Sequence, residues 1–171
     1  MIKVIHQGLG PIGLLTAQQV LGNKEMEIIG AIDINPSLQG KDLGSVLGLD
    51  PLGISITGSL ESMFKQIPEE KPEEGEGTVL VLTTSSRLRD IARDIEAAVK
   101  HNIHVVSPAE ELFYPDVVDQ SLTNHLDDLA REHGVVILGR GVNPGCLMDA
   151  YPLAEIKTHF DRIISMEIHR S

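Results

Sequence analysis

The chain has 171 residues, 42% of them hydrophobic, and carries a formal net charge of −11 with its histidines neutral. This acidity argues against a phosphate-backbone site, which needs a basic patch, so we expect no nucleic-acid partner. The single cysteine rules out an internal disulfide framework, no Cys/His cluster has zinc-site spacing, and no apolar run approaches the ~20 residues that cross a bilayer.

The first 33 residues predict a strand, a helix and a second strand, at residues 2–7, 11–22 and 26–33. Both strands are almost uninterrupted apolar runs, which suit a parallel sheet covered on both faces. His6, inside the first strand, is expected to be a core residue with its hydrogen bonds satisfied. The stretch MIKVIHQG lacks the long apolar core of a signal peptide, so we expect a cytoplasmic location and no membrane partner.

Three glycines with the spacing G-x-G-x-x-G, namely Gly8, Gly10 and Gly13, connect this strand to this helix. The first permits a tight turn, the second lets the backbone approach a pyrophosphate, and the third lets the helix pack on the strand. Pro11 lies in the first helical turn, where a missing N–H costs nothing. The arrangement predicts that a dinucleotide binds at the helix N-terminus.

Asp33 lies 20 residues past Gly13, at the end of the second strand. A carboxylate there accepts hydrogen bonds from a ribose hydroxyl pair and repels a 2′-phosphate, which favours NAD over NADP. The alternative is an aspartate that caps the turn at Asn35-Pro36. Lys41 lies close enough along the chain to keep NADP possible.

The segment that follows is less regular. A short helix is expected near residues 41–47, a short strand at 54–57 and a helix over 60–67, before an acidic, solvated loop at 68–77.

Residues 78–86 are predicted to form a strand that ends in hydroxyl side chains, followed by a helix over 87–102. In an open α/β sheet this end of the strand faces the ligand crevice, so Thr83, Thr84 and Ser85 are candidates for contact with the cofactor. The alternative role is a helix cap at Ser85 or Ser86.

A strand at residues 103–107 leads to two adjacent carboxylates, Glu110 and Glu111. One of them could bind a substrate ammonium group or relay a proton. Acidic residues in the first turn of a helix explain the same pattern equally well.

The last third predicts a helix over 119–133, a strand over 134–139, a helix over 146–157 and a strand over 162–169. Asn143-Pro144-Gly145 is a strong turn signal. Cys146 has no base implied nearby and is expected to be a small packing residue. Because strand and helix alternate throughout, the expected fold is a Rossmann-type, doubly wound parallel sheet with helices on both faces.

Four stretches, HQGLGPIG, AIDINPSLQGKDLG, SPAEELFYP and GRGVNPGCLMDAYPL, resemble the diaminopentanoate dehydrogenase-like proteins, which are relatives of dihydrodipicolinate reductase and include amine dehydrogenases. Pro108 and Ala109 stand where that family often has Thr and Cys, and Arg140 stands where a small residue is usual. The resemblance implies an NAD(P)-dependent oxidoreductase that acts on a C–N bond of a small amine or imine.

The resemblance also implies roles for individual residues. Glu110 matches a carboxylate that holds the substrate amine, and Asn143 lies in a loop lining the nicotinamide pocket. Thr84 and Ser85 lie near the nicotinamide ribose. Gly8, Gly10, Ile12 and Gly13 would bind the pyrophosphate, and Asp33 would bind the adenosine ribose.

The family chain is roughly twice this length, so we expect a cofactor domain at residues 1–150 and the start of a second, substrate and dimerisation domain at 151–171. We expect the second domain to be largely absent, the chain alone to turn over poorly, and a homo-oligomer to form. The alternatives are a dihydrodipicolinate reductase-like or semialdehyde-type reductase and a free-standing NAD(H)-binding regulatory module. No metal site is expected.

Overall fold

A single parallel sheet of six strands organises the chain in the computed structural model, which describes residues 1–65, 77–162, 164, 165 and 167. The strand order is β3-β2-β1-β4-β5-β6, and every adjacent pair is parallel. The strands are β1 (Ile2–Gln7), β2 (Met26–Ile32), β3 (Ile56–Thr57), β4 (Thr78–Leu82), β5 (His104–Ser107) and β6 (Ile137–Gly139).

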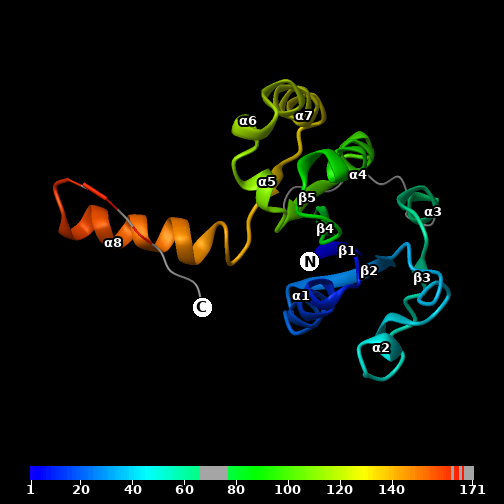
Figure 1. Ribbon diagram of the computed structural model, residues 1–171. Coiled ribbons are helices and arrows are strands. Elements are labelled where there is room, and N and C mark those ends of the chain that lie inside the picture. Colours follow the sequence, from blue (N-terminus) through cyan, green and yellow to red (C-terminus); the bar gives the residue numbers. More distant parts are fainter. Residues whose placement is uncertain (66–76, 163, 166, 168–171) are drawn as a thin grey trace.

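Helices cover both faces of this sheet (Figure 1). The crossover helix α1 packs over β1 and β2, while α4 and α7 pack on the opposite face. The helical segments are α1 (Pro11–Leu21), α2 (Leu43–Val46), α3 (Leu60–Phe64), α4 (Leu88–Lys100), α5 (Glu110–Phe113), α6 (Pro115–Val118), α7 (Gln120–His133), the π-helix η1 (Cys146–Ala150) and α8 (Tyr151–His159). The predicted doubly wound sheet is confirmed.

Helix α4 shows how the sequence builds this layer. Its apolar residues recur every three or four positions, and Leu88, Ile91, Ile95 and Val99 are all completely buried against the sheet. Charged residues occupy the outer side of the helix. This pattern is typical of a helix that packs one side against a sheet.

The strand order fixes where a ligand can bind. The chain leaves β1 toward β2 through α1, and it leaves β4 toward β5 through α4, so adjacent strands β1 and β4 send their connections to opposite faces. A crevice forms at such a reversal, beyond the carboxyl ends of the strands. The glycine turn after β1 and the hydroxyl residues after β4 both lie at this edge.

Several expected element boundaries are wrong. Strand β4 ends at Leu82, so residues 83–86 form a loop, and the last strand begins at Ile137 rather than at residue 134. Of the strand expected at 162–169, the described residues 162, 164, 165 and 167 are not in a strand, and the others lie outside the described residues. The helix expected over 60–67 ends at Phe64, and residues 66–76, which hold most of the expected acidic loop, also lie outside.

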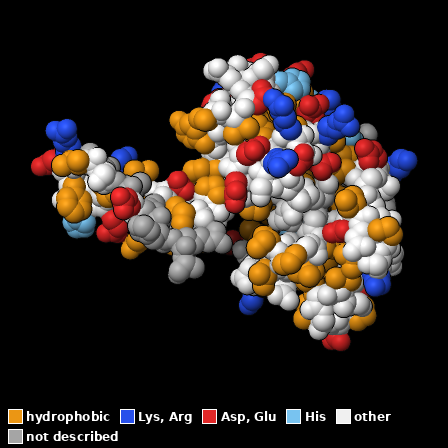
Figure 2. All heavy atoms as spheres, in the orientation of Figure 1, with side chains coloured by type: hydrophobic (Ala, Val, Ile, Leu, Met, Phe, Trp, Pro, Cys, Tyr) orange, Lys and Arg blue, Asp and Glu red, His pale blue; other side chains and the backbone are white. Residues whose placement is uncertain are grey.

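The C-terminal helix α8 projects away from the sheet and its helices (Figure 1). None of its residues is buried, and it carries exposed apolar side chains, among them Tyr151 and Leu153, with Phe160 just beyond its end. Hydrophobic side chains are visible on this projecting segment in Figure 2. Among the described residues, no helix combines the length and the apolar character needed to cross a membrane.

Candidate cofactor-binding site

Two of the three glycines shape the turn itself. Gly8 has φ +94° and donates its amide to the Ile32 carbonyl (2.9 Å), which ties the turn to the neighbouring strand β2. Gly13 packs so tightly that a Cβ atom on it would collide with the Gly8 carbonyl and the Thr83 hydroxyl. Both positions therefore require glycine for steric reasons.

The third glycine faces open space. Gly10 is the N-cap of α1, and in the part of the chain that the structure describes no side chain caps it and a Cβ added there would meet no atom within 4 Å. Among the described residues, the backbone amides of Gly10, Ile12 and Gly13 have no acceptor, and Leu14 makes the first helical hydrogen bond to the Gly10 carbonyl (2.9 Å). These open amides at the positive end of a helix form a cradle that could hold an anion such as a pyrophosphate.

Asp33 is built into this cradle. Its Oδ2 accepts a hydrogen bond from the Leu9 amide (2.6 Å), and its Oδ1 accepts one from the Asn35 amide (2.8 Å). The second bond is the turn cap that the sequence left as an alternative. Since a carboxylate has about four acceptor positions, the group can still accept hydrogen bonds from ribose hydroxyls.

The hydroxyl residues after β4 divide into structural and available groups. The Thr83 hydroxyl donates a hydrogen bond to the Gly8 carbonyl (2.8 Å), and the Gln7 carbonyl lies at 3.0 Å, so Thr83 stabilises the glycine turn. Ser85 donates to Asp90 (2.8 Å) and accepts from the Arg87 amide (3.2 Å). Thr84 is exposed and, within the described part of the chain, its hydroxyl has no partner.

The expected cap of the following helix is wrong in detail. The N-cap of α4 is Arg87, and neither Ser85 nor Ser86 caps it. Instead Glu111, distant in sequence, accepts a hydrogen bond from the Leu88 amide through Oε2 (2.8 Å). The Glu111 amide also donates to the Ser86 carbonyl (3.1 Å), so this residue joins α5 to the start of α4.

This contact distinguishes the roles of the two adjacent carboxylates. Glu111 is half-buried and engaged, whereas Glu110 is exposed and has no partner among the described residues. Glu110 begins α5, three positions after β5 ends at the carboxyl edge of the sheet. Of the two, Glu110 is the carboxylate available to a ligand.

The loop after β6 lies at the same edge. The Gly145 amide donates to Asp149 Oδ2 (2.7 Å), and the Gly141 amide donates to the Pro144 carbonyl (3.1 Å), which closes the predicted turn. Asn143 is half-buried, and no described group hydrogen-bonds its side chain. Cys146 is exposed, so the expectation of a packing residue is wrong.

Two polar residues that the sequence analysis missed hold this edge together. Ser107, fully buried, donates to the Leu82 carbonyl (2.6 Å) and accepts from the Ala109 amide (3.2 Å), which links the ends of β4 and β5. Gln7 donates to Asp94 on α4 (2.8 Å). Burial raises the pKa of Asp94, against the opposing effect of the Gln7 hydrogen bond. The sequence could have indicated both residues, because each is a polar residue at the last position of an apolar strand.

His6 departs from expectation. It is completely buried, as predicted, but within the described part of the chain neither ring nitrogen has a hydrogen-bond partner, so the expected hydrogen bonds are not found. Burial lowers the pKa of His6 from 6.5 to about 4, with the backbone of Gly13 opposing part of the shift. The folded protein therefore holds this imidazole neutral directly beneath the first turn of α1.

A pH dependence of stability follows from His6. Between about pH 6.5 and 4 the unfolded chain binds a proton here that the folded chain does not, so stability falls as pH falls through this window. The full shift corresponds to about 3 kcal/mol. Urea unfolding of the wild type and His6→Leu at pH 7 and pH 4.5 measures it. The wild type should lose more stability than the variant on acidification, and equal losses would contradict the assignment.

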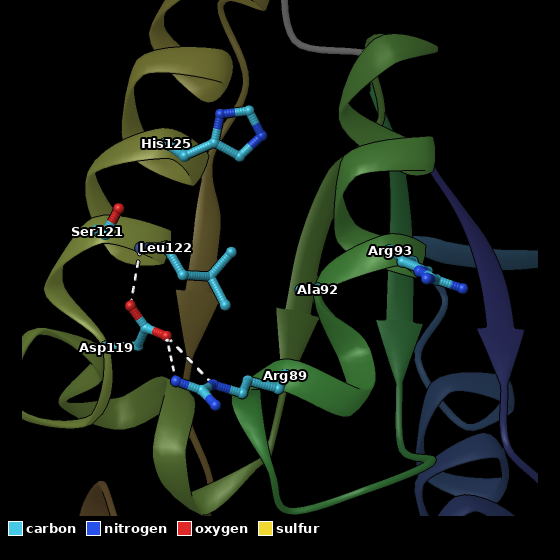
Figure 3. Close-up of a pocket in the computed structure, with 7 residues that line it drawn as sticks. All are labelled: Arg89, Ala92, Arg93, Asp119, Ser121, Leu122 and His125. Atoms are coloured by element: carbon cyan, nitrogen blue, oxygen red, sulfur yellow. Dashed lines mark hydrogen bonds and ion pairs between the residues drawn. The ribbon is translucent and has the colours of Figure 1, made fainter.

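A groove on the described surface lies elsewhere. It measures about 580 Å³ and runs between α4 and α7 on the outer side of the helical layer (Figure 3), lined by Arg89, Ala92, Arg93, Asp119, Ser121, Leu122 and His125. Arg89 and Asp119 form an ion pair across it (2.8 Å). It contains none of the residues predicted to bind the cofactor. The described residues include no group of three or more His, Cys, Asp or Glu side chains placed to hold a metal ion.

The parallel sheet, its strand order and the glycine turn at the switch point define a Rossmann-type α/β domain. No family model matches the sequence. Over 148 residues the chain is 34% identical to a 2,4-diaminopentanoate dehydrogenase from Acetoanaerobium sticklandii, a match that covers 86% of this chain and 40% of that protein. It is 24% identical to a 4-hydroxy-tetrahydrodipicolinate reductase from Synechocystis sp. over 169 residues, 98% of this chain and 57% of that protein.

The solved structure of an amine dehydrogenase from Mycobacterium smegmatis superimposes with a TM-score of 0.71 and 27% sequence identity, covering 82% of this chain and 39% of that one. The predicted relationship is confirmed: the homologues of this chain are dehydrogenases and reductases of the diaminopentanoate dehydrogenase and dihydrodipicolinate reductase kind. The chain spans between 39% and 57% of the length of these relatives. Such relatives imply a nicotinamide cofactor without distinguishing NAD from NADP.

Proposed function

We propose that this chain is the NAD-binding domain of an oxidoreductase that moves a hydride between the nicotinamide and a C–N bond of a small amine or imine. The observation that carries the proposal is the cradle of open amides at the start of α1. Gly10 faces open space there, and the Asp33 carboxylate borders the same turn. The 2,4-diaminopentanoate dehydrogenase and amine dehydrogenase relatives support a C–N substrate.

Within this proposal the pyrophosphate lies on the amides of Gly10, Ile12 and Gly13. Pro11 has no N–H to contribute, and its exposed ring forms part of the wall of the cradle. The nicotinamide ribose lies near Thr84. The Thr83 and Ser85 hydroxyls mainly make contacts within the protein, because Thr83 bonds to the glycine turn and Ser85 bonds to Asp90 at the start of α4. Asn143 lines the nicotinamide pocket.

NAD is the expected cofactor rather than NADP. Asp33 places a negative charge where the adenosine ribose would bind, and this charge repels a 2′-phosphate. Lys41, the basic residue noted in the sequence, is exposed on a separate turn, with its amide donating to the Leu38 carbonyl (3.1 Å). No described carboxylate pairs with it.

Glu110 is the proposed catalytic residue. Bound NAD would supply the hydride acceptor. Glu110 holds the substrate ammonium, and as the C–H bond gives its hydride and the C=N bond forms, the carboxylate receives the proton that the nitrogen releases. In the opposite direction the same group returns that proton to the nitrogen.

The division of the chain is part of the proposal. Residues 1–150 form the cofactor domain, and α8, which buries none of its residues, begins a second domain that supplies the rest of the substrate site. The exposed apolar side chains on and after α8 support a homo-oligomer. A cytoplasmic location remains the expectation from the sequence.

A titration tests the cofactor assignment. NAD should raise the melting temperature and bind at least tenfold more tightly than NADP, because only NADP meets the Asp33 charge at its 2′-phosphate. Gly10→Val should weaken NAD binding at least a hundredfold, since its side chain fills the cradle. Isothermal calorimetry measures both.

Gly22→Val, at the other end of α1 with φ −73°, is the matched control and should bind NAD as the wild type does. Preference for NADP would refute the role of Asp33, and equal binding by Gly10→Val and the wild type would refute the cradle.

A second function, reduction of a dihydrodipicolinate-like substrate, is favoured by the Synechocystis relative, whose match covers 98% of this chain. It shares the cofactor site and differs in substrate. Turnover assays with an amine and with a cyclic imine separate the two.

A further inference from the structure

One face of the parallel sheet is covered over only part of its width. The pairing register aligns His6 of β1 with Val81 of β4, Val106 of β5 and Leu138 of β6, so these four side chains lie on the same face. His6 is completely buried beneath α1, Val81 and Val106 are half-buried, and Leu138 is exposed. Burial on this face therefore falls from the strand that α1 covers to the edge strand.

The opposite face of the same strands is well covered. Leu80 and Leu82 of β4 and Val105 of β5 are completely buried and share one core with residues of α4 and α7. In Figure 1 the helices α4 to α7 lie on one side of β4 and β5, whereas α1 lies on the other side, next to β1 and β2. Over β4, β5 and β6, the α1 side of the sheet therefore lacks a covering helix among the described residues.

The residues on this uncovered surface are apolar. We call the surface the open face, and it consists of Val79, Val81, His104, Val106, Val136 and Leu138. Its one polar member is engaged, because His104 Nδ1 accepts the Val136 amide (3.0 Å). A parallel sheet is apolar on both faces when other elements cover both of them. Val136 and Leu138 are nevertheless 58% and 45% exposed, so the open face fits an apolar partner.

Helix α8 is the counterpart of the open face, since it is a helix that packs on no sheet. None of its residues is buried, and Tyr151, Leu153 and the adjoining Phe160 are exposed. Its nine residues span about 13 Å. Strands β4 and β5, with five and four residues, are about 13–17 Å long, so the helix matches them in length.

The connection between β6 and α8 keeps the two surfaces of one chain apart. The Leu147 amide donates to the Val142 carbonyl (2.9 Å), and the Gly145 amide donates to Asp149 Oδ2 (2.7 Å). These bonds fix the direction in which the helix leaves the sheet, and Figure 1 shows α8 pointing away from it. Folding α8 back onto its own sheet would disrupt them, whereas packing on another copy leaves them intact.

We propose that two copies of this chain form a dimer in which α8 of each copy packs on the open face of the other. A two-fold axis generates both contacts, because each copy supplies one helix and one sheet face. Helices are the elements that cover parallel sheets, and the apolar side chains buried on both partners drive the association. The proposal identifies the dimer interface and does not depend on the cofactor assignment.

Two double variants test the exchange. The open-face variant carries Val136→Lys and Leu138→Lys, and the helix variant carries Tyr151→Glu and Leu153→Glu. Sedimentation velocity at micromolar concentration should show a dimer for the wild type and a monomer for each variant alone, because both contacts then bury charge. An equimolar mixture of the two variants should recover a dimer. One of its contacts carries no substitution, and the other brings lysines opposite glutamates.

Leu49→Lys combined with Leu52→Lys is the matched control, since both leucines are exposed on the loop between α2 and β3. This variant should remain a dimer. A monomeric wild type, or a mixture that stays monomeric, overturns the proposal. A dimer that only one of the two test variants disrupts also overturns it, because sheet faces or helices would then pair with their own kind.

Hydrogen exchange on the wild type keeps the proposal testable if a variant fails to fold. Amides of α8 should exchange at least tenfold more slowly in the dimer than after dilution to the monomer. Exchange that does not change on dilution overturns the proposal. Protection of the open face at every concentration would indicate that a segment of the same polypeptide covers it instead.

Discussion

Replacing Gly13 with alanine is expected to lower the free energy of unfolding by about 3 kcal/mol, at the upper end of overpacking penalties. The added Cβ would collide with the Gly8 carbonyl and the Thr83 hydroxyl, and neither lies at the end of a flexible side chain. Because α1 must move away from β1 to relieve the collision, the cradle should be lost as well. Urea unfolding monitored by circular dichroism measures the change.

Gly10→Ala is the matched control, since its Cβ would meet no described atom within 4 Å and its φ of −69° suits any residue. It should cost less than about 1 kcal/mol, as an N-cap substitution does. Equal destabilisation by both variants would contradict the packing described for Gly13.

Glu110→Gln is expected to lower kcat for amine oxidation by about 10²- to 10⁴-fold, the range typical of a lost general acid–base group. Its carboxylate is exposed and without a described partner, so stability and NAD affinity should remain at wild-type values. Steady-state kinetics on the polypeptide from the whole reading frame, with calorimetry for NAD, measures these quantities.

Glu111→Gln is expected to affect stability rather than turnover. It weakens the acceptor for the Leu88 amide and should cost about 1 kcal/mol of stability, with a much smaller effect on kcat. If Glu110→Gln left turnover unchanged, the catalytic assignment would fail. If no form of the protein turned over an amine while NAD still bound, a regulatory NAD(H)-binding module would be the better account.

The glycine turn and the doubly wound parallel sheet were predictable because they depend on local patterns and on the alternation of strand and helix. Gly8, Gly10 and Gly13 follow an apolar strand and precede a helix, and Asp33 stands at the end of the next strand. Each part of that fingerprint has a steric or electrostatic reason that can be read within a few residues. The structure places all four around one turn.

Contacts between distant segments were not predictable in the same way. Nothing near Leu88 in the sequence indicates that Glu111, 23 positions later, accepts its amide. Thr83 was expected to face a ligand, yet its hydroxyl holds the glycine turn. His6 was expected to find hydrogen-bond partners, but both ring nitrogens are buried without one among the residues that the structure describes. These outcomes depend on how the elements pack, which periodicity does not encode.

The two backbone amides held by Asp33 bear on how cofactor preference can evolve. Because this carboxylate accepts the amides of Leu9 and Asn35, exchanging it for a neutral or basic residue would loosen the turn at which we propose that the coenzyme binds. A lineage shifting toward the phosphorylated coenzyme would have to keep the aspartate and gain positive charge beside it. Ser37 and Lys41 are exposed on the neighbouring loop, so a positive charge could be added or repositioned at these residues without disturbing the core.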